Sequence, residues 1–157
     1  MIVKDIRYED FVNYKKPSMF IVFPYCSFKC EKECGMKICQ NSSLVMSKNI
    51  YLDTKSVVNK YMSNHITQAI VCGGLEPFDS WGDLREFIIA LRQRTNDDIV
   101  IYTGYNKEEI INKIDWLRRF INVVIKFGRY IPNHKSHFDA VLGVNLASDN
   151  QYAERIS

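Results

Sequence analysis

Four short apolar runs constrain the fold of this chain more than any other feature. They are rich in β-branched and aromatic residues and are nearly continuous, which is typical of strands buried on both faces of a parallel sheet. A fifth run contains Gly143 and is a weaker strand candidate. The four runs are "MFIVFP" (19–24), "AIVC" (69–72), "IVIY" (99–102) and "VVIKF" (123–127), and the fifth is "AVLGV" (140–144).

Helical patterns at 54–62, 80–93 and 106–121 separate the later strands. Ser80 and Asp83 have the spacing of a capping box, and Asn106 is a plausible N-cap. Strands that alternate with helices predict an α/β fold with a mainly parallel sheet. Only about five such units fit in the chain, which excludes a complete eight-stranded barrel and leaves a partial (β/α) barrel or an open sheet.

The end of the chain, from 146 to 157, is polar, and we predict a loop followed by a short helix there. The net charge is +3, with acidic and basic residues interspersed, so we expect no nucleic-acid partner. No apolar stretch approaches the roughly 20 residues of a membrane span. The first fifteen residues carry charges throughout and do not resemble a signal peptide, so the expected compartment is the cytoplasm.

Four of the five cysteines lie close together in the sequence, with the spacing Cys26-x3-Cys30-x3-Cys34-x4-Cys39. The first of them, Cys26, lies two residues after the end of the first apolar run. Cytoplasmic thiols stay reduced, so a disulfide framework is the poorer interpretation. Closely spaced thiolates on one loop suit an iron–sulfur cluster. Spacing alone leaves open a zinc loop or unliganded thiols. The remaining cysteine, Cys72, ends an apolar run and is expected in the core.

Glycines follow three of the predicted strands, in "GGLEP" (73–77), "YTGY" (102–105) and "KFGRYIP" (126–132). Ligands of parallel α/β proteins bind at the carboxyl ends of the strands, where the cysteine loop also begins. Glycine lets the backbone approach a ligand closely at such an edge. The sequence therefore predicts one site that combines the cysteines with these glycine-rich segments.

Taken together, the Cys-x3-Cys loop, "GGLEP" and "YTGY" resemble the corresponding motifs of radical S-adenosylmethionine (radical SAM) enzymes. More narrowly, the chain is similar to the small activating proteins of anaerobic ribonucleoside-triphosphate reductase. "KFGRYIP" and "LASDNQ" (146–151) extend the similarity, which covers roughly residues 18 to 152. The resemblance implies a partial (β/α) barrel of the radical SAM type, formed by residues 1–157 as one domain.

The family loop is usually Cys-x3-Cys-x2-Cys, but residue 33 of this chain is a glutamate. Cys34 and Cys39 therefore compete for the role of third ligand. Cys39 follows the apolar Ile38 and precedes "QNSSL", which looks like the family's continuation. The resemblance accordingly implies that Cys26, Cys30 and Cys39 hold a 4Fe–4S cluster, with "EKECGMKI" (31–38) as an inserted bulge and Cys34 as the alternative.

The resemblance also implies a SAM site. Leu75 is inserted between the glycines and Glu76, which leaves open whether Glu76 or the backbone of 73–75 meets the SAM amino group. Thr103 is a candidate SAM contact by its position after the third strand. The implied cofactor-binding residues are Ile38, Gly73, Gly74, Leu75, Glu76, Thr103 and Gly104.

In this family the cluster and SAM generate a 5′-deoxyadenosyl radical that abstracts a hydrogen from a glycine of the large reductase subunit. The resemblance thus implies a protein substrate, a one-electron donor such as flavodoxin or ferredoxin, and no catalytic residue beyond the cluster and SAM. Segment 128–138 is the first candidate for the partner contact. Two alternatives are a small radical SAM enzyme that acts on a modified purine, and a non-catalytic zinc-binding interaction domain.

Overall fold

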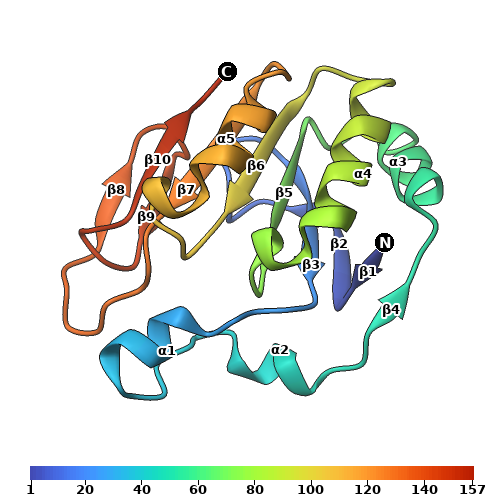
Figure 1. The fold of residues 1–157 in the computed structure, drawn as a ribbon. Coiled ribbons are helices and arrows are strands. Elements are labelled where there is room, and N and C mark those ends of the chain that lie inside the picture. Colours follow the sequence, from blue (N-terminus) through green and yellow to red (C-terminus); the bar gives the residue numbers. More distant parts are fainter.

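The computed structural model describes residues 1–157, which build a six-stranded sheet in the order β10-β7-β6-β5-β3-β2 (Figure 1). The four central strands are parallel, and the two edge strands, β2 and β10, run antiparallel to their neighbours. The four long apolar runs are therefore confirmed as parallel strands. The strands are β2 (Asp5–Asp10), β3 (Ser18–Phe23), β5 (Ala69–Gly74), β6 (Asp98–Tyr102), β7 (Val123–Phe127) and β10 (Tyr152–Arg155).

The central strands follow one another in chain order, without a reversal. Parallel crossovers have a constant hand, so crossovers that advance in one direction place their helices on the same face. The crossovers contain α3 (Thr54–Met62), α4 (Trp81–Arg92) after the short η1 (Pro77–Ser80), and α5 (Ile111–Leu117) after η2 (Lys107–Ile110). The sheet does not close on itself, so the fold is mixed α/β with a mainly parallel sheet and no closed barrel.

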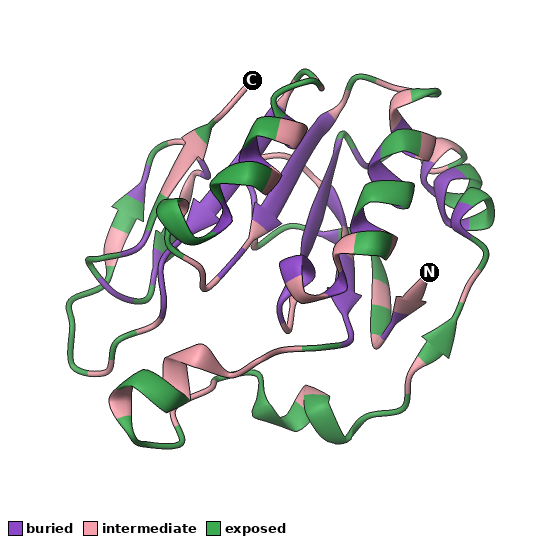
Figure 2. Ribbon diagram, in the orientation of Figure 1, coloured by how far each residue is buried: buried purple, intermediate pink, exposed green.

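Two layers of apolar side chains cover the two faces of this sheet. Figure 2 shows the central strands coloured mostly as buried. The helical face holds the larger layer, in which Leu84, Ile88 and Leu91 of α4 pack against the central strands. Cys72 lies in this layer and is fully buried, as the sequence predicts. The opposite face is covered by Tyr14 and Leu142 from loops and by Leu146 from a short strand outside the sheet. Burial on both faces explains why the strand sequences are continuously apolar.

The predicted strand at 140–144 is wrong. Residues 140–143 form a turn between β8 (His137–Asp139) and β9 (Val144–Leu146), which pair as a separate antiparallel hairpin. Gly143 has φ 74° at this turn, and a Cβ atom there would come within 2.7 Å of the Lys15 Cβ. The apolar residues of this segment cover the sheet face instead of joining the sheet.

The predicted C-terminal helix is also wrong, because residues 152–155 form β10. This strand occupies the open edge of β7, and its Tyr152 ring lies 5.3 Å from the Phe127 ring. The strands near the N-terminus, β1 (Ile2–Val3) and β2, and the short β4 (Ile50–Tyr51) were not predicted, because charged residues interrupt their apolar pattern or they are too short.

The Ser80–Asp83 capping box does not form. The Asp83 carboxylate accepts a hydrogen bond from the Ile2 N–H at 2.8 Å, and the buried Ser80 hydroxyl has no partner. Asn106, in contrast, is the N-cap of η2, and its N–H donates to the Glu109 carboxylate at 2.8 Å. No helix of the structure has the length and apolar character that crossing a membrane requires.

The cysteine loop connects β3 to β4 and carries two short helices, α1 (Lys29–Cys34) and α2 (Ser42–Met46). Figure 1 shows both helices beyond the carboxyl ends of the central strands, on the side where β3, β5, β6 and β7 end. The loop therefore lies at the edge where parallel α/β folds bind their ligands.

Candidate functional site

Three hydrogen bonds join the cysteine loop to the last residue of β5 and the segment that follows it. The Glu76 N–H donates to the Tyr25 main-chain oxygen at 2.7 Å. The Ser27 N–H donates to the Asp79 carboxylate at 2.6 Å, next to Cys26. On the far side of the loop, the Asn41 side-chain amide donates to the Gly74 oxygen at 2.9 Å. The "GGLEP" segment thus holds both ends of the loop that carries the cysteines.

The four clustered cysteines are free thiols and partly buried. Burial raises the pKa of Cys26 to about 12, even though the Phe28 N–H donates to its sulfur at 3.2 Å. Burial also raises the pKa of Cys30, and the nearby Cys39 raises it further. Metal ligands must be thiolates, so binding of a metal or cluster at these residues releases protons.

Cys34 and Cys39 differ in their surroundings. The Cys34 sulfur lies 3.4 Å from the Met36 oxygen and 3.7 Å from the Glu31 oxygen, so its thiol points at the main chain of its own helix end. Cys39 is held by a hydrogen bond from its N–H to the Glu31 carboxylate at 3.1 Å, and it is close enough to influence the pKa of Cys30.

No three Cys, His, Asp or Glu side chains converge tightly enough to hold a single metal ion. The structure therefore does not bring Cys26, Cys30 and Cys39 into one ligand set for a single ion. A cluster differs from a single ion in this respect, because each thiolate binds a different iron and the sulfurs stand apart. A loop with several thiols on its partly buried side fits that donor chemistry.

Glu76 is 5% exposed, and both of its carboxylate oxygens accept hydrogen bonds from the chain. One oxygen accepts from the Thr103 hydroxyl at 2.8 Å and from the Phe78 N–H at 3.1 Å, and the other accepts from the Gly104 N–H at 2.9 Å. Burial raises its pKa to about 7, although these three donors act in the opposite direction. Glu76 thereby connects the end of β5 to the end of β6.

The positions at this edge require glycine for different structural reasons. A Cβ at Gly73 would come within 2.9 Å of the Phe20 ring, and Gly74 has φ 87° and would overlap Val22. Packing in the sheet therefore explains both. Gly104 has no such constraint, since its nearest neighbour would be the Glu76 carboxylate at an ordinary 3.7 Å. At Gly104, the close approach of a ligand to the main chain would explain why the residue is a glycine.

Sequence reasoning missed the central role of Arg129. Arg129 is 7% exposed, and its side chain makes two hydrogen bonds to the Glu109 carboxylate, at 2.7 and 2.8 Å. It also pairs with Glu33 of α1 at 3.0 Å, while Lys29 of α1 pairs with Glu109 at 3.0 Å. The Arg129 guanidinium lowers the pKa of Glu109 to about 2. These ion pairs attach α1 to the segments after β6 and β7. The sequence signal for Arg129 was its position directly after a predicted strand.

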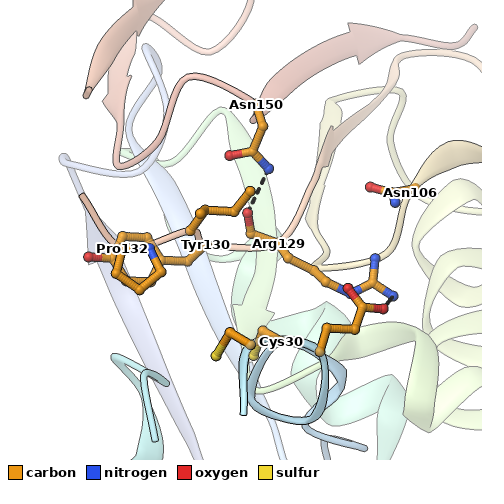
Figure 3. Close-up of a pocket in the computed structure, with 9 residues that line it drawn as sticks. Cys30, Asn106, Arg129, Tyr130, Pro132 and Asn150 are labelled. Atoms are coloured by element: carbon orange, nitrogen blue, oxygen red, sulfur yellow. Dashed lines mark hydrogen bonds and ion pairs between the residues drawn. The ribbon is translucent and has the colours of Figure 1, made fainter. Parts of the chain in front are cut away.

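Two hollows lie beside this network, and both are lined by Cys30 and Arg129. The larger has a volume of about 260 Å³ (Figure 3). The smaller has a volume of about 30 Å³. The larger is lined by Cys30, Glu33, Cys34, Asn106, Arg129, Tyr130, Ile131, Pro132 and Asn150, and the smaller by Cys26, Ser27, Lys29, Cys30, Glu76, Gly104, Tyr105 and Arg129.

The structure thus brings only some of the predicted site residues to one hollow. Cys26, Cys30, Glu76 and Gly104 line the smaller one together. Cys34 lines the larger one. Six further predicted residues line neither hollow, namely Ile38, Cys39, Gly73, Gly74, Leu75 and Thr103. Ile38 and Leu75 are partly buried, and Thr103 is buried under the Glu76 carboxylate.

A part-buried loop with four thiols, held at the carboxyl edge of a mainly parallel sheet, defines a class of cysteine-rich α/β protein suited to an iron–sulfur cofactor. The family model described as "4Fe-4S single cluster domain" matches residues 18–151, and the chain belongs to that family. No match was found among curated proteins or among solved structures. Family membership and the cysteine loop support a 4Fe–4S cluster as the cofactor.

Proposed function

We propose that this protein is a radical SAM activase that generates a glycyl radical on anaerobic ribonucleoside-triphosphate reductase. The observation that carries the proposal is the attachment of the cysteine loop to "GGLEP", through the Glu76–Tyr25 and Asn41–Gly74 hydrogen bonds. Two motifs that resemble those of radical SAM enzymes thereby lie at one edge of the sheet. Membership of the 4Fe-4S family is consistent with the required cofactor.

In this proposal Cys26, Cys30 and Cys39 hold the cluster. Cys39 is preferred to Cys34 because its flanking residues, Ile38 and "QNSSL", resemble the family loop, whereas the Cys34 thiol points at the main-chain oxygens of Glu31 and Met36. Once bound, the cluster would supply the one electron that cleavage of SAM to methionine and a 5′-deoxyadenosyl radical requires, and the hydrogen atom for that radical would come from a glycine of the reductase.

The chain's own contribution is to bind and orient. Glu76 fixes the main chain of Gly104 at the edge, and Gly104 leaves room there for SAM. The hollow that they line has a volume of about 30 Å³, far below the roughly 300–1,000 Å³ of typical small-molecule pockets, so the proposal requires the cysteine loop to move when the cofactors bind. We further propose that residues 1–157 act as one domain of the partial-barrel radical SAM type, in the cytoplasm, with flavodoxin or ferredoxin as the electron donor.

The test is anaerobic reconstitution with iron and sulfide, followed by electron paramagnetic resonance of the reduced protein with and without SAM. We expect the cluster signal to change when SAM is added, 5′-deoxyadenosine to form, and a glycyl radical to appear on an added large reductase subunit. Cys72→Ala is the matched control, because it removes a thiol that lies in the core and outside the loop.

Each alternative predicts a different result. A colourless protein that binds zinc and does not respond to SAM would leave only the zinc-binding interaction domain. Formation of 5′-deoxyadenosine with a purine precursor, and none with the reductase subunit, would move the assignment to the small-molecule enzyme.

A further inference from the structure

Aromatic rings and cations combine on the outer side of α4 and α5, which Figure 1 shows on the same face of the sheet. Trp81 of α4 packs edge-on against Trp116 of α5, with ring centres 5.3 Å apart, and the Phe120 ring follows Trp116 at 4.8 Å. This region lines neither hollow. We call it the aromatic–cation surface, and it consists of Trp81, Arg85, Lys113, Trp116, Arg119 and Phe120.

Three cations of this surface lie over its rings. The Arg85 and Arg119 guanidinium groups lie 5.1 and 4.9 Å from the centre of the Trp116 ring. The Lys113 ammonium lies 5.6 Å from the centre of the Trp81 ring. A cation is attracted to the face of an aromatic ring, so the rings hold these three head groups in place.

None of these three cations has a carboxylate partner, because every ion pair of the structure involves other basic residues. The carboxylates of α4 and α5 are engaged by other groups, namely Asp83 by the Ile2 N–H, Glu86 by the Thr54 hydroxyl and Asp115 by Arg118. The aromatic–cation surface therefore carries three positive charges that no acidic side chain of the protein neutralises.

The same cations keep free hydrogen-bond donors. Arg85 is exposed and donates no hydrogen bond within the chain. Arg119 donates only its Nε, to the Trp116 main-chain oxygen at 3.1 Å, and Lys113 donates to the Phe78 main-chain oxygen at 2.9 Å. The remaining donors are thus oriented before a ligand arrives, which lowers the cost of ordering these side chains on binding.

We propose that the aromatic–cation surface binds an acidic segment of a partner protein. A carboxylate is a planar acceptor that matches the paired donors of a guanidinium group. In an extended segment, side chains at alternate positions point the same way and stand about 6.6 Å apart. Arg85 and Arg119, which share the Trp116 ring, suit two such carboxylates, and Lys113 suits a third.

Two other anionic partners, nucleic acid and membrane, fit this surface less well. A nucleobase stacks on an open ring face, whereas two guanidinium groups already lie over Trp116. Aromatic side chains at a membrane surface insert among the lipid headgroups, whereas Trp81 and Trp116 pack on each other and are partly buried. The surface therefore offers fixed positive charge and no free ring.

The experiment measures the fluorescence anisotropy of a labelled peptide, in which glutamate alternates with serine, on anaerobically reconstituted protein. The same peptide with glutamine in place of glutamate is the uncharged probe. Arg85→Gln removes one cation of the surface. Arg94→Gln is the matched control, because Arg94 is exposed, lies just beyond the end of α4 and binds Asn59. Trp116→Leu removes the shared ring and leaves the net charge unchanged.

We expect Arg85→Gln and Trp116→Leu each to weaken binding of the acidic peptide by about fivefold, while Arg94→Gln leaves it unchanged. Urea denaturation shows which variants fold, and the exposed Arg85→Gln tests the proposal alone if Trp116→Leu does not. The proposal is overturned if the acidic peptide does not bind, if the uncharged probe binds as tightly, if the two arginine variants behave alike, or if folded Trp116→Leu binds like the wild type.

Phosphatidylcholine vesicles that contain phosphatidylserine, and a single-stranded oligothymidine, are measured in parallel on the same variants. Tighter binding of either one that is lost in Arg85→Gln would move the assignment to a membrane or to nucleic acid and overturn the proposal. No residue of the surface belongs to the proposed cluster or SAM site, so SAM cleavage should be the same in Arg85→Gln and in the wild type.

Discussion

Asn41 donates its side-chain amide to the main-chain oxygen of Gly74 at 2.9 Å, and this bond ties the segment after Cys39 to the end of β5. We predict that Asn41→Ala loosens this end of the loop and speeds loss of the cluster to a chelator a few-fold, as expected for one net hydrogen bond of about 1 kcal/mol. The decay of visible absorbance under an iron chelator measures it. Gln40→Ala, at the exposed neighbouring position, should decay like the wild type.

We expect opposite effects on cluster content when the two candidate third ligands, Cys34 and Cys39, are replaced. Cys39→Ala should reconstitute without a 4Fe–4S cluster, because only two thiols of the proposed ligand set remain. Cys34→Ala should retain the iron and sulfide content of the wild type, since the Cys34 thiol points at main-chain oxygens. Iron analysis and visible spectra distinguish the two. Loss of the cluster in Cys34→Ala alone would assign the third ligand to Cys34.

Gly104→Ala tests the approach of SAM. A Cβ at this position meets only ordinary contacts, so we expect the free energy of unfolding to change by no more than about 0.5 kcal/mol. SAM affinity should fall by about tenfold if the cofactor packs against this backbone. Equilibrium binding of SAM and urea denaturation measure the two effects.

Gly74→Ala and Gly82→Ala are the stability references for that variant. Gly74 has φ 87° and a Cβ there overlaps Val22, so we expect Gly74→Ala to cost at least about 1–2 kcal/mol. Gly82 lies in α4 with open space around it, and its replacement by alanine should stabilise the protein by roughly 0.5–1 kcal/mol. Equal unfolding midpoints for these two variants would contradict the structural interpretation of the glycines.

Glu76 should make stability depend on pH. Its folded-state pKa is raised to about 7 by burial, above its ordinary value of 4.5. The folded protein therefore holds this proton more tightly than the unfolded chain. Protonation of Glu76 therefore adds roughly 3 kcal/mol to the free energy of unfolding. This stabilisation is complete below about pH 4.5 and is lost as the pH rises through about 7.

Glu76→Gln removes this titration, so between pH 5 and 8 its unfolding free energy should fall less than that of the wild type. It should also be less stable than the wild type at pH 5, because the amide nitrogen cannot accept a hydrogen bond from Phe78, Thr103 or Gly104, whereas both oxygens of the protonated Glu76 carboxyl still can. Urea denaturation at both pH values gives the comparison. Identical pH dependence in the two proteins would mean that Glu76 does not titrate in this range.

Local patterns in the sequence determined the central strands, the helices α3 and α4, the N-cap at Asn106 and the position of the cysteine loop. Each depends on neighbouring residues: a continuous apolar run for a buried strand, a 3.6-residue period for a helix, and close spacing for the thiols. The central strands and the cysteine loop both lie within residues 18–151, which the family model matches.

Tertiary contacts decided the rest. Segment 140–144 has the composition of a strand, yet it packs over the sheet face, and the polar 152–155 becomes a strand because the edge of β7 is open to it. Asp83 binds Ile2, and Arg129 joins Glu109 to Glu33, across separations that no local pattern encodes. Sequence spacing reports on neighbours along the chain, whereas a strand at a sheet edge and an ion-pair network at a site depend on which segments the fold brings together.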